Sequence, residues 1–160
     1  MKFGHVLRKE REGKTGLNRS NPYEPDEMAK RLGIAPTDYA QLEADDSPAE
    51  KWFCLLCNLA VKLGAPTSRL LAESGRSADC AAGRAGPLIR ARREERGFTV
   101  EEMAELLGVS VEEYVPIEKG TSPIETYGPL LLRFAELIDQ PVFNLFLPCG
   151  LPYAQLNDYP

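Results

Sequence analysis

The amino-acid sequence predicts an all-α protein built from two small helical units in tandem. Three observations support this fold class. Apolar residues recur at the spacing of a helix, no segment alternates apolar and polar residues as a half-buried strand does, and the second half repeats the first. A chain of 160 residues, 43% of them hydrophobic, has room for one ordinary domain or two small ones but not for a barrel enzyme.

The repeat follows one ungapped register. Residues 28–34 align with residues 103–109, 75 positions later, and the register holds as far as Leu71 and Phe146. Beyond the first of these segments, the identical pairs are Tyr39/Tyr114, Glu43/Glu118, Ser47/Ser122, Pro48/Pro123, Glu50/Glu125, Leu55/Leu130, Leu56/Leu131, Ala60/Ala135, Pro66/Pro141 and Leu70/Leu145. The apolar residues therefore occupy equivalent positions in the two copies, which predicts two units with the same helices.

Upstream of this register the two units differ in length. Gly4 and Arg11 match Gly86 and Arg93 at a spacing of 82, so the first unit has a longer loop, within residues 13–22. The predicted organisation is a first unit at 1–72, a linker at 73–85, a second unit at 86–147 and a tail at 148–160. The small residues of the linker favour a flexible connection.

The second unit shows the helix boundaries most clearly. Residues 89–96 predict a charged first helix, which Gly97 ends. Thr99, with Glu102 three residues later, has the pattern of a capping box and begins the second helix. Gly108 ends that helix, because glycine readily takes the left-handed conformation of a tight turn.

Two more helices follow in the second unit. Ser110, with Glu113 three residues later, caps a third helix that Gly120 ends. Proline is unfavourable inside a helix, so Pro129 predicts that the fourth helix begins close to it, and Pro141 ends it. Residues 142–147 form a short last helix or apolar segment.

The first unit is expected to have the same elements. Pro25 begins its second helix and Pro36 its third. Residues 52–60 form an apolar helix that contains the CxxC pair Cys54 and Cys57. Because zinc ligands with this spacing usually lie on turns, we interpret both as buried small apolar residues, with a metal site or a redox pair as alternatives.

Composition narrows the classes of function. A net charge of −5 and a pI near 5.0 argue against binding to nucleic acid by bulk charge alone. His5 is the single histidine, which disfavours histidine-based catalysis or metal binding, so no catalytic residue, cofactor or metal is expected. No run reaches the roughly 20 apolar residues of a membrane span, and we expect a cytoplasmic protein that does not bind membranes.

Residues 89–110, which read IRARREERGFTVEEMAELLGVS, and the later Ile117-Glu118-Lys119-Gly120 together resemble a known domain. They are similar to the helix-turn-helix domain of the lambda-repressor and Cro (XRE) type. The first unit has the same resemblance in fainter form. It implies an all-α fold of two tandem lambda-repressor-like bundles of about five helices each.

The resemblance also implies structural roles for two pairs of charged residues. In the family, the residues that match Arg93 and Glu118 form a salt bridge between the first and third helices. Arg11 and Glu43 match them in the first unit. The resemblance further implies that Ala29 and Ala104 lie where two helices cross closely.

The third helix reads DNA in this family, and here its residues depart from the usual pattern. The exposed residues expected to contact DNA or a partner are Thr37, Asp38, Gln41, Glu112 and Glu113. The family's glutamine at the start of the second helix is replaced by Val100 and by Pro25. Carboxylates oppose binding to phosphate, and Pro116 should bend the third helix of the second unit.

Positive charge is concentrated instead near the start of each unit. The residues proposed for phosphate contacts are Arg8, Lys9, Lys14, Arg19, Arg90, Arg92 and Arg96. The alternative is a solvated helix face on which neighbouring glutamates pair with these cations.

Two functions follow from these observations. The resemblance implies a DNA-binding transcriptional regulator whose two units act as a pseudo-dimer on double-stranded DNA. The acidic third helices favour instead a helix-turn-helix scaffold that recognises a protein partner. The chain has no glycine-rich phosphate loop and no nucleophile beside a base, so we expect no enzyme; a homodimer remains open.

Overall fold

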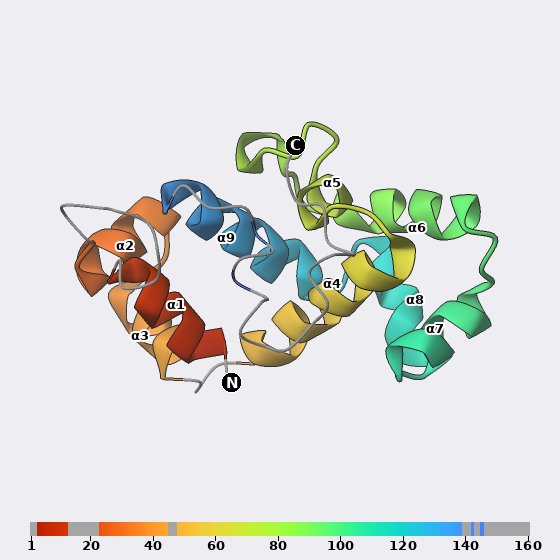
Figure 1. Cartoon of the computed structure of the whole chain (residues 1–160), viewed down its shortest axis with the longest axis horizontal. Coiled ribbons are helices and arrows are strands. Elements are labelled where there is room, and N and C mark those ends of the chain that lie inside the picture. Colours follow the sequence, from red (N-terminus) through yellow and green to blue (C-terminus); the bar gives the residue numbers. More distant parts are fainter. Residues whose placement is uncertain (1–2, 13–22, 45–47, 139–141, 143–144, 146–160) are drawn as a thin grey trace.

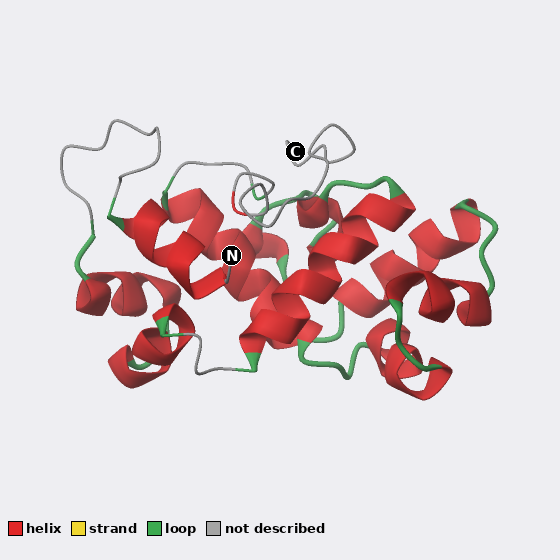
Figure 2. Ribbon diagram, turned by 60° about the horizontal axis from the view of Figure 1, so that its bottom comes forward, coloured by secondary structure: helices red, strands yellow, loops and turns green. Residues whose placement is uncertain are grey.

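The computed structural model describes residues 3–12, 23–44, 48–138, 142 and 145. Every regular element in these ranges is helical, which confirms the all-α prediction (Figure 2). No helix within them is long and apolar enough to cross a membrane. The elements are α1 Phe3–Arg11, α2 Pro25–Leu32, α3 Pro36–Glu43, α4 Ala49–Leu63, α5 Thr67–Leu71, the 3₁₀ turn η1 Ser77–Asp79, α6 Ala85–Glu95, α7 Val100–Leu107, α8 Val111–Lys119 and α9 Ile124–Leu137.

The helices form two groups with a pair of long helices between them. Figure 1 shows α1, α2 and α3 at one end of the molecule, α6, α7 and α8 at the other, and α4 and α9 in the middle. The long helix α4 packs on α1 and α9 and also on α7, while α9 packs on α4 and α6 and also on α2. Each long helix therefore contacts the three-helix group of the other half.

The apolar core is continuous across this arrangement. Phe53 of α4 lies 5.2 Å from the ring of Phe3 and 6.0 Å from that of Tyr127, so it joins α1 to α9. Leu131 and Phe134 of α9 line the same small cavity as residues of α1, α2 and α3. The buried side chains of both halves form one cluster, so the division into two domains stays a prediction.

The predicted capping signals are confirmed. Thr99 Oγ1 accepts the amide of Glu102 at 3.1 Å and the Glu102 carboxylate accepts the amide of Thr99 at 3.1 Å, which completes the capping box. Ser110 Oγ accepts the amide of Glu113 at 3.1 Å. Gly108 ends α7 with a left-handed φ of 72°. Each cap joins residues only three positions apart, and the glycine acts at its own position. The sequence alone could therefore locate these helix ends.

The prediction that the fourth helix begins near Pro129 is wrong. It begins at Ile124, and Pro129 lies inside α9. Ser122 Oγ accepts the amide of Ile124 at 3.3 Å, and Ile124 is buried, so the start is fixed five residues earlier. Proline there removes one backbone hydrogen bond, the bond that residue 129 would donate to the carbonyl of Glu125.

The first helix of the second half also begins earlier than expected, at Ala85 rather than Ile89. The carboxylate of Glu125 accepts the amides of Ala85 and Gly86 at 3.2 and 3.0 Å. Glu50 has the same role in the first half, where it accepts the amide of Phe3 at 2.9 Å. These contacts supply acceptors for the amides that a helix leaves unpaired at its start.

The segment before α6 is held by specific contacts. Its 3₁₀ turn packs on α9, and the amide of Ser77 donates to Glu136 at 2.9 Å. The long loop at 13–22, the tail at 148–160 and most of the last predicted helix at 142–147 lie outside the described residues.

Candidate nucleic-acid interface

The second half contains two consecutive helices joined by a tight turn, α7 and α8, with α6 packed across α8. Ala104 is 2% exposed where α7 crosses its neighbours, and Ala29 of α2 is fully buried. Gly86 brings α6 close to the end of α8, because a Cβ on it would lie 2.5 Å from the amide nitrogen of Gly120. Small residues thus permit backbones to approach closely at these crossings.

An ion pair links the first and third helices of this group. Arg93 donates to both oxygens of Glu118, with N···O distances of 2.6 and 3.0 Å, and to the carbonyl of Phe98 at 2.7 Å. The two side chains are 11% and 10% exposed. The Glu118 carboxylate raises the pKa of Arg93 above its ordinary value by hydrogen bonding. The pair is a structural brace and not an open binding site.

The first half has the same brace. Arg11 donates to both oxygens of Glu43 at 2.7 and 3.0 Å and to the carbonyl of Tyr23 at 2.9 Å. A buried tyrosine accompanies each pair: Tyr39 lies beside Glu43 and Tyr114 beside Glu118, and both tyrosines are 0% exposed. Burial raises the pKa of both phenols above the ordinary value.

The third helices present carboxylates to solvent. Glu112 and Glu113 are exposed in the first turn of α8, and Asp38 is exposed in the first turn of α3 with Thr37 and Gln41 beside it. Lys51 of α4 lies 3.7 Å from Glu113, but both side chains are more than half exposed, so this pair is weak. Pro116 lies inside α8 as expected.

The negative surface extends over α7. Glu101, Glu102 and Glu105 are exposed there, and Lys119 is the only Lys or Arg in residues 100–119. A helix carrying these charges opposes the approach of phosphate groups.

The residues proposed for phosphate contacts lie on other faces. Three of them pair with glutamates on their own helices: Arg8 with Glu12 at 3.6 Å, Arg90 with Glu94 at 3.3 Å and Arg92 with Glu95 at 3.9 Å. Arg96 donates to the carbonyl of Leu63 at 2.8 Å, at the end of α4. Lys9 is exposed on α1, while Lys14 and Arg19 lie outside the described residues.

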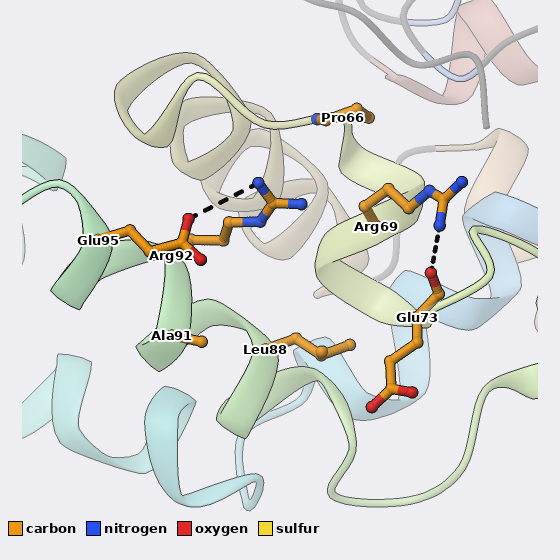
Figure 3. A pocket seen from close by; sticks show the side chains of 7 residues that line it. All are labelled: Pro66, Arg69, Glu73, Leu88, Ala91, Arg92 and Glu95. Atoms are coloured by element: carbon orange, nitrogen blue, oxygen red, sulfur yellow. Dashed lines mark hydrogen bonds and ion pairs between the residues drawn. The ribbon is translucent and has the colours of Figure 1, made fainter.

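A groove beside these arginines was not anticipated from the sequence. It lies between α5 and α6 and is lined by Pro66, Arg69, Glu73, Leu88, Ala91, Arg92 and Glu95 (Figure 3). Arg69 donates to the backbone carbonyl of Glu73, and Arg92 pairs with Glu95 across one turn. Both guanidinium groups are thus engaged locally, which makes the groove mixed in charge.

The cysteines are accommodated within the fold. Cys57 is buried in the core, and Cys54 is half-buried with its thiol 3.9 Å from the carboxylate of Glu50. Burial raises the pKa of the Cys80 thiol to about 11. Within the described ranges, no group of His, Cys, Asp and Glu side chains has a metal-binding arrangement.

The helices α7 and α8, the turn between them and the bracing α6 define a helix-turn-helix unit. Residues 89–125 match the model of the family described as Helix-turn-helix. The matched stretch begins within α6 and ends at the second residue of α9. No curated protein and no solved structure matches the chain. Residues 89–125 are therefore similar to helix-turn-helix domains of the lambda-repressor and Cro type.

Proposed function

We propose that this protein is a DNA-binding transcriptional regulator in which one chain supplies two helix-turn-helix units that act as a pseudo-dimer. The family match of residues 89–125 supports DNA binding, and one observation carries the pseudo-dimer: α4 and α9 each pack on the three-helix group of the other half. The two third helices, α3 and α8, are thereby held in a fixed relation by the apolar core. Proteins of this class read two half-sites about one helical turn apart.

The equivalent contacts of the two halves support this duplication. The ion pairs Arg11–Glu43 and Arg93–Glu118 have the same bidentate geometry. Glu50 and Glu125 accept amides at the start of α1 and α6. Because one chain supplies both units, the proposed active species is a monomer, and sedimentation velocity distinguishes it from the homodimer left open by the sequence.

Phosphate contacts in this proposal come from exposed arginines. The pairs of Arg90 and Arg92 with their own-helix glutamates are exposed and contribute only about 0.3–0.5 kcal/mol each, so phosphate can replace the glutamate. The test is electrophoretic mobility shift with genomic fragments at about 50 mM salt, where electrostatic attraction is strong. Binding is expected there, and Arg90→Ala should weaken it and lower the salt dependence by about one unit.

Arg76→Ala is the matched control, because Arg76 is exposed in the segment before α6 and belongs to neither three-helix group. It should leave the shift unchanged. Absence of binding at about 50 mM salt would refute the regulator proposal.

A specific observation favours a second candidate, a helix-turn-helix scaffold that recognises a protein. The first turn of α8 exposes Glu112 and Glu113 where a DNA-reading helix needs donors to bases or phosphates. Glu112→Lys with Glu113→Lys should raise DNA affinity strongly if carboxylates alone prevent docking. Asp79→Lys, an exposed change in η1, supplies a charge control outside both three-helix groups. If the Glu112→Lys, Glu113→Lys double variant still does not bind DNA, the result supports the protein-binding scaffold.

A further inference from the structure

Two large apolar side chains stand out on the surface of the described residues. Leu106 is 40% exposed at the end of α7, and Val111 is 38% exposed at the start of α8. Leu106 and the half-buried Phe98 line a depression whose other walls are Glu102 and Glu105. The surface therefore combines an apolar floor with two carboxylates.

The first half has different chemistry at the corresponding positions, 75 residues earlier. There Tyr23, Glu27, Lys30 and Arg31 take the places of Phe98, Glu102, Glu105 and Leu106. The guanidinium of Arg31 lies 4.9 Å from the centre of the Tyr23 ring and 2.9 Å from Glu27. In the first half, an aromatic ring and a carboxylate thus hold a cation that belongs to the chain itself.

The second half has the ring and the carboxylates without such a cation. Residues 100–107 contain no Lys or Arg, and within the described residues Glu105 forms no ion pair. Glu102 uses one carboxylate oxygen in the capping box, through the amide of Thr99. The nearby Arg93 is fully engaged by Glu118 and by the carbonyl of Phe98. Among the described residues, no Lys or Arg therefore compensates the charge of Glu105 in this depression.

We propose that the depression bounded by Phe98, Glu102, Glu105 and Leu106 binds a basic segment of a partner protein. An apolar side chain of that segment packs on Phe98 and Leu106, and a neighbouring Lys or Arg reaches Glu105. Charge complementarity selects this occupant, since a nucleic acid would bring phosphates against the carboxylates. The inference goes beyond DNA binding and does not depend on it.

The test uses the full chain labelled with ¹⁵N and a synthetic peptide as probe. The probe is a capped peptide of about twelve residues that contains Lys, Arg and two leucines. Two companion peptides replace the leucines with serine or the basic residues with glutamate. The leucine-containing basic peptide should shift amide resonances of residues 98–111, and the serine peptide should bind about tenfold more weakly, as expected for loss of about 1.4 kcal/mol.

Variants of the chain follow from the internal comparison. Glu105→Lys with Leu106→Arg introduces the first-half residues and should abolish the shifts. The converse change, Lys30→Glu with Arg31→Leu, should create a second set of shifts around Tyr23. Asp26→Lys, an exposed change of equal charge to Glu105→Lys, should leave the affinity unchanged within about twofold.

Several results would overturn the inference. Equal binding of the serine peptide would show attraction by charge alone. Shifts spread over α3, or shifts of the same amides by duplex DNA, would place the partner elsewhere or in another class. Shifts that depend on protein concentration without any peptide would identify a second copy as the occupant. Because the mobility-shift assay reads DNA binding separately, failure of either proposal leaves the other standing.

Discussion

Replacement of Glu118 by alanine should destabilise the protein far more than replacement of an exposed glutamate. Arg93 is bound by both oxygens of Glu118 and by the carbonyl of Phe98, and its side chain is only 11% exposed. The change leaves a guanidinium charge almost buried with a single acceptor. Breaking one side of a buried pair costs about 3–5 kcal/mol, whereas an exposed pair such as Arg90–Glu94 contributes about 0–1 kcal/mol.

Two separate measurements test this prediction. Urea unfolding gives the free energy of unfolding, and calorimetry gives the Tm. At about 2–4 °C per kcal/mol for a chain of this size, Glu118→Ala should lower the Tm by roughly 6–20 °C. Glu94→Ala, the matched control on α6, should lower it by about 0–4 °C. A loss of stability for Glu118→Ala no larger than that of the control would refute the role of the brace.

The same variant tests whether the two halves unfold together. Trp52, the single tryptophan, lies on α4 in the first half, and its fluorescence reports unfolding there. Because α4 packs on α7 and α9 packs on α2, destabilising α8 should also lower the urea midpoint of Trp52. A Trp52 transition that stays at its wild-type midpoint while the circular-dichroism signal shifts would instead show two independent domains.

Further predictions concern buried groups of both halves. Because burial raises the folded pKa of Tyr39 and Tyr114, only the unfolded chain ionises just above pH 10, so stability should fall by about 1.4 kcal/mol per pH unit for each phenol. Tyr114→Phe should remove one phenol's share of the slope of stability against pH, measured by urea unfolding between pH 10 and 11. An unchanged slope would contradict this account. Gly86→Ala should cost about 1–3 kcal/mol by the same measurement, since its Cβ would meet backbone atoms of α8 at under 3 Å; wild-type stability would exclude that close approach. Cys80, with its pKa near 11, should react with iodoacetamide at pH 8 much more slowly than a model thiol, and equal rates would place it in solvent.

Local signals in the sequence correctly predicted the starts of α7 and α8. The capping box at Thr99 and the cap at Ser110 depend on residues three apart, so the chain itself carries the geometry. Pro129 gave a wrong start for α9, because that start depends on contacts between residues distant in sequence. Burial of Ile124 and the amide acceptor Glu125 depend on partners distant in sequence, and these outweigh one lost hydrogen bond.

The crossing of the long helices could not be predicted from periodicity. The apolar face of α4 has the same spacing whether it packs on its own half or on α7. The exposure of Leu106 could not be predicted either. Leu106 and Leu107 are adjacent, and the apolar periodicity of α7 does not decide which of them faces solvent. In the structure Leu107 is 9% exposed and Leu106 is 40% exposed.

The two halves agree at their braces and differ on the outer side of their second helices. The ion pairs and the amide acceptors Glu50 and Glu125 need the same geometry in each half, because each half must hold its first helix against its third and fourth. Lys30 and Arg31 face solvent where the other half has Glu105 and Leu106, and no packing demand fixes those positions. The proposed partner site on α7 therefore rests on exposed residues that packing leaves free to differ between the halves.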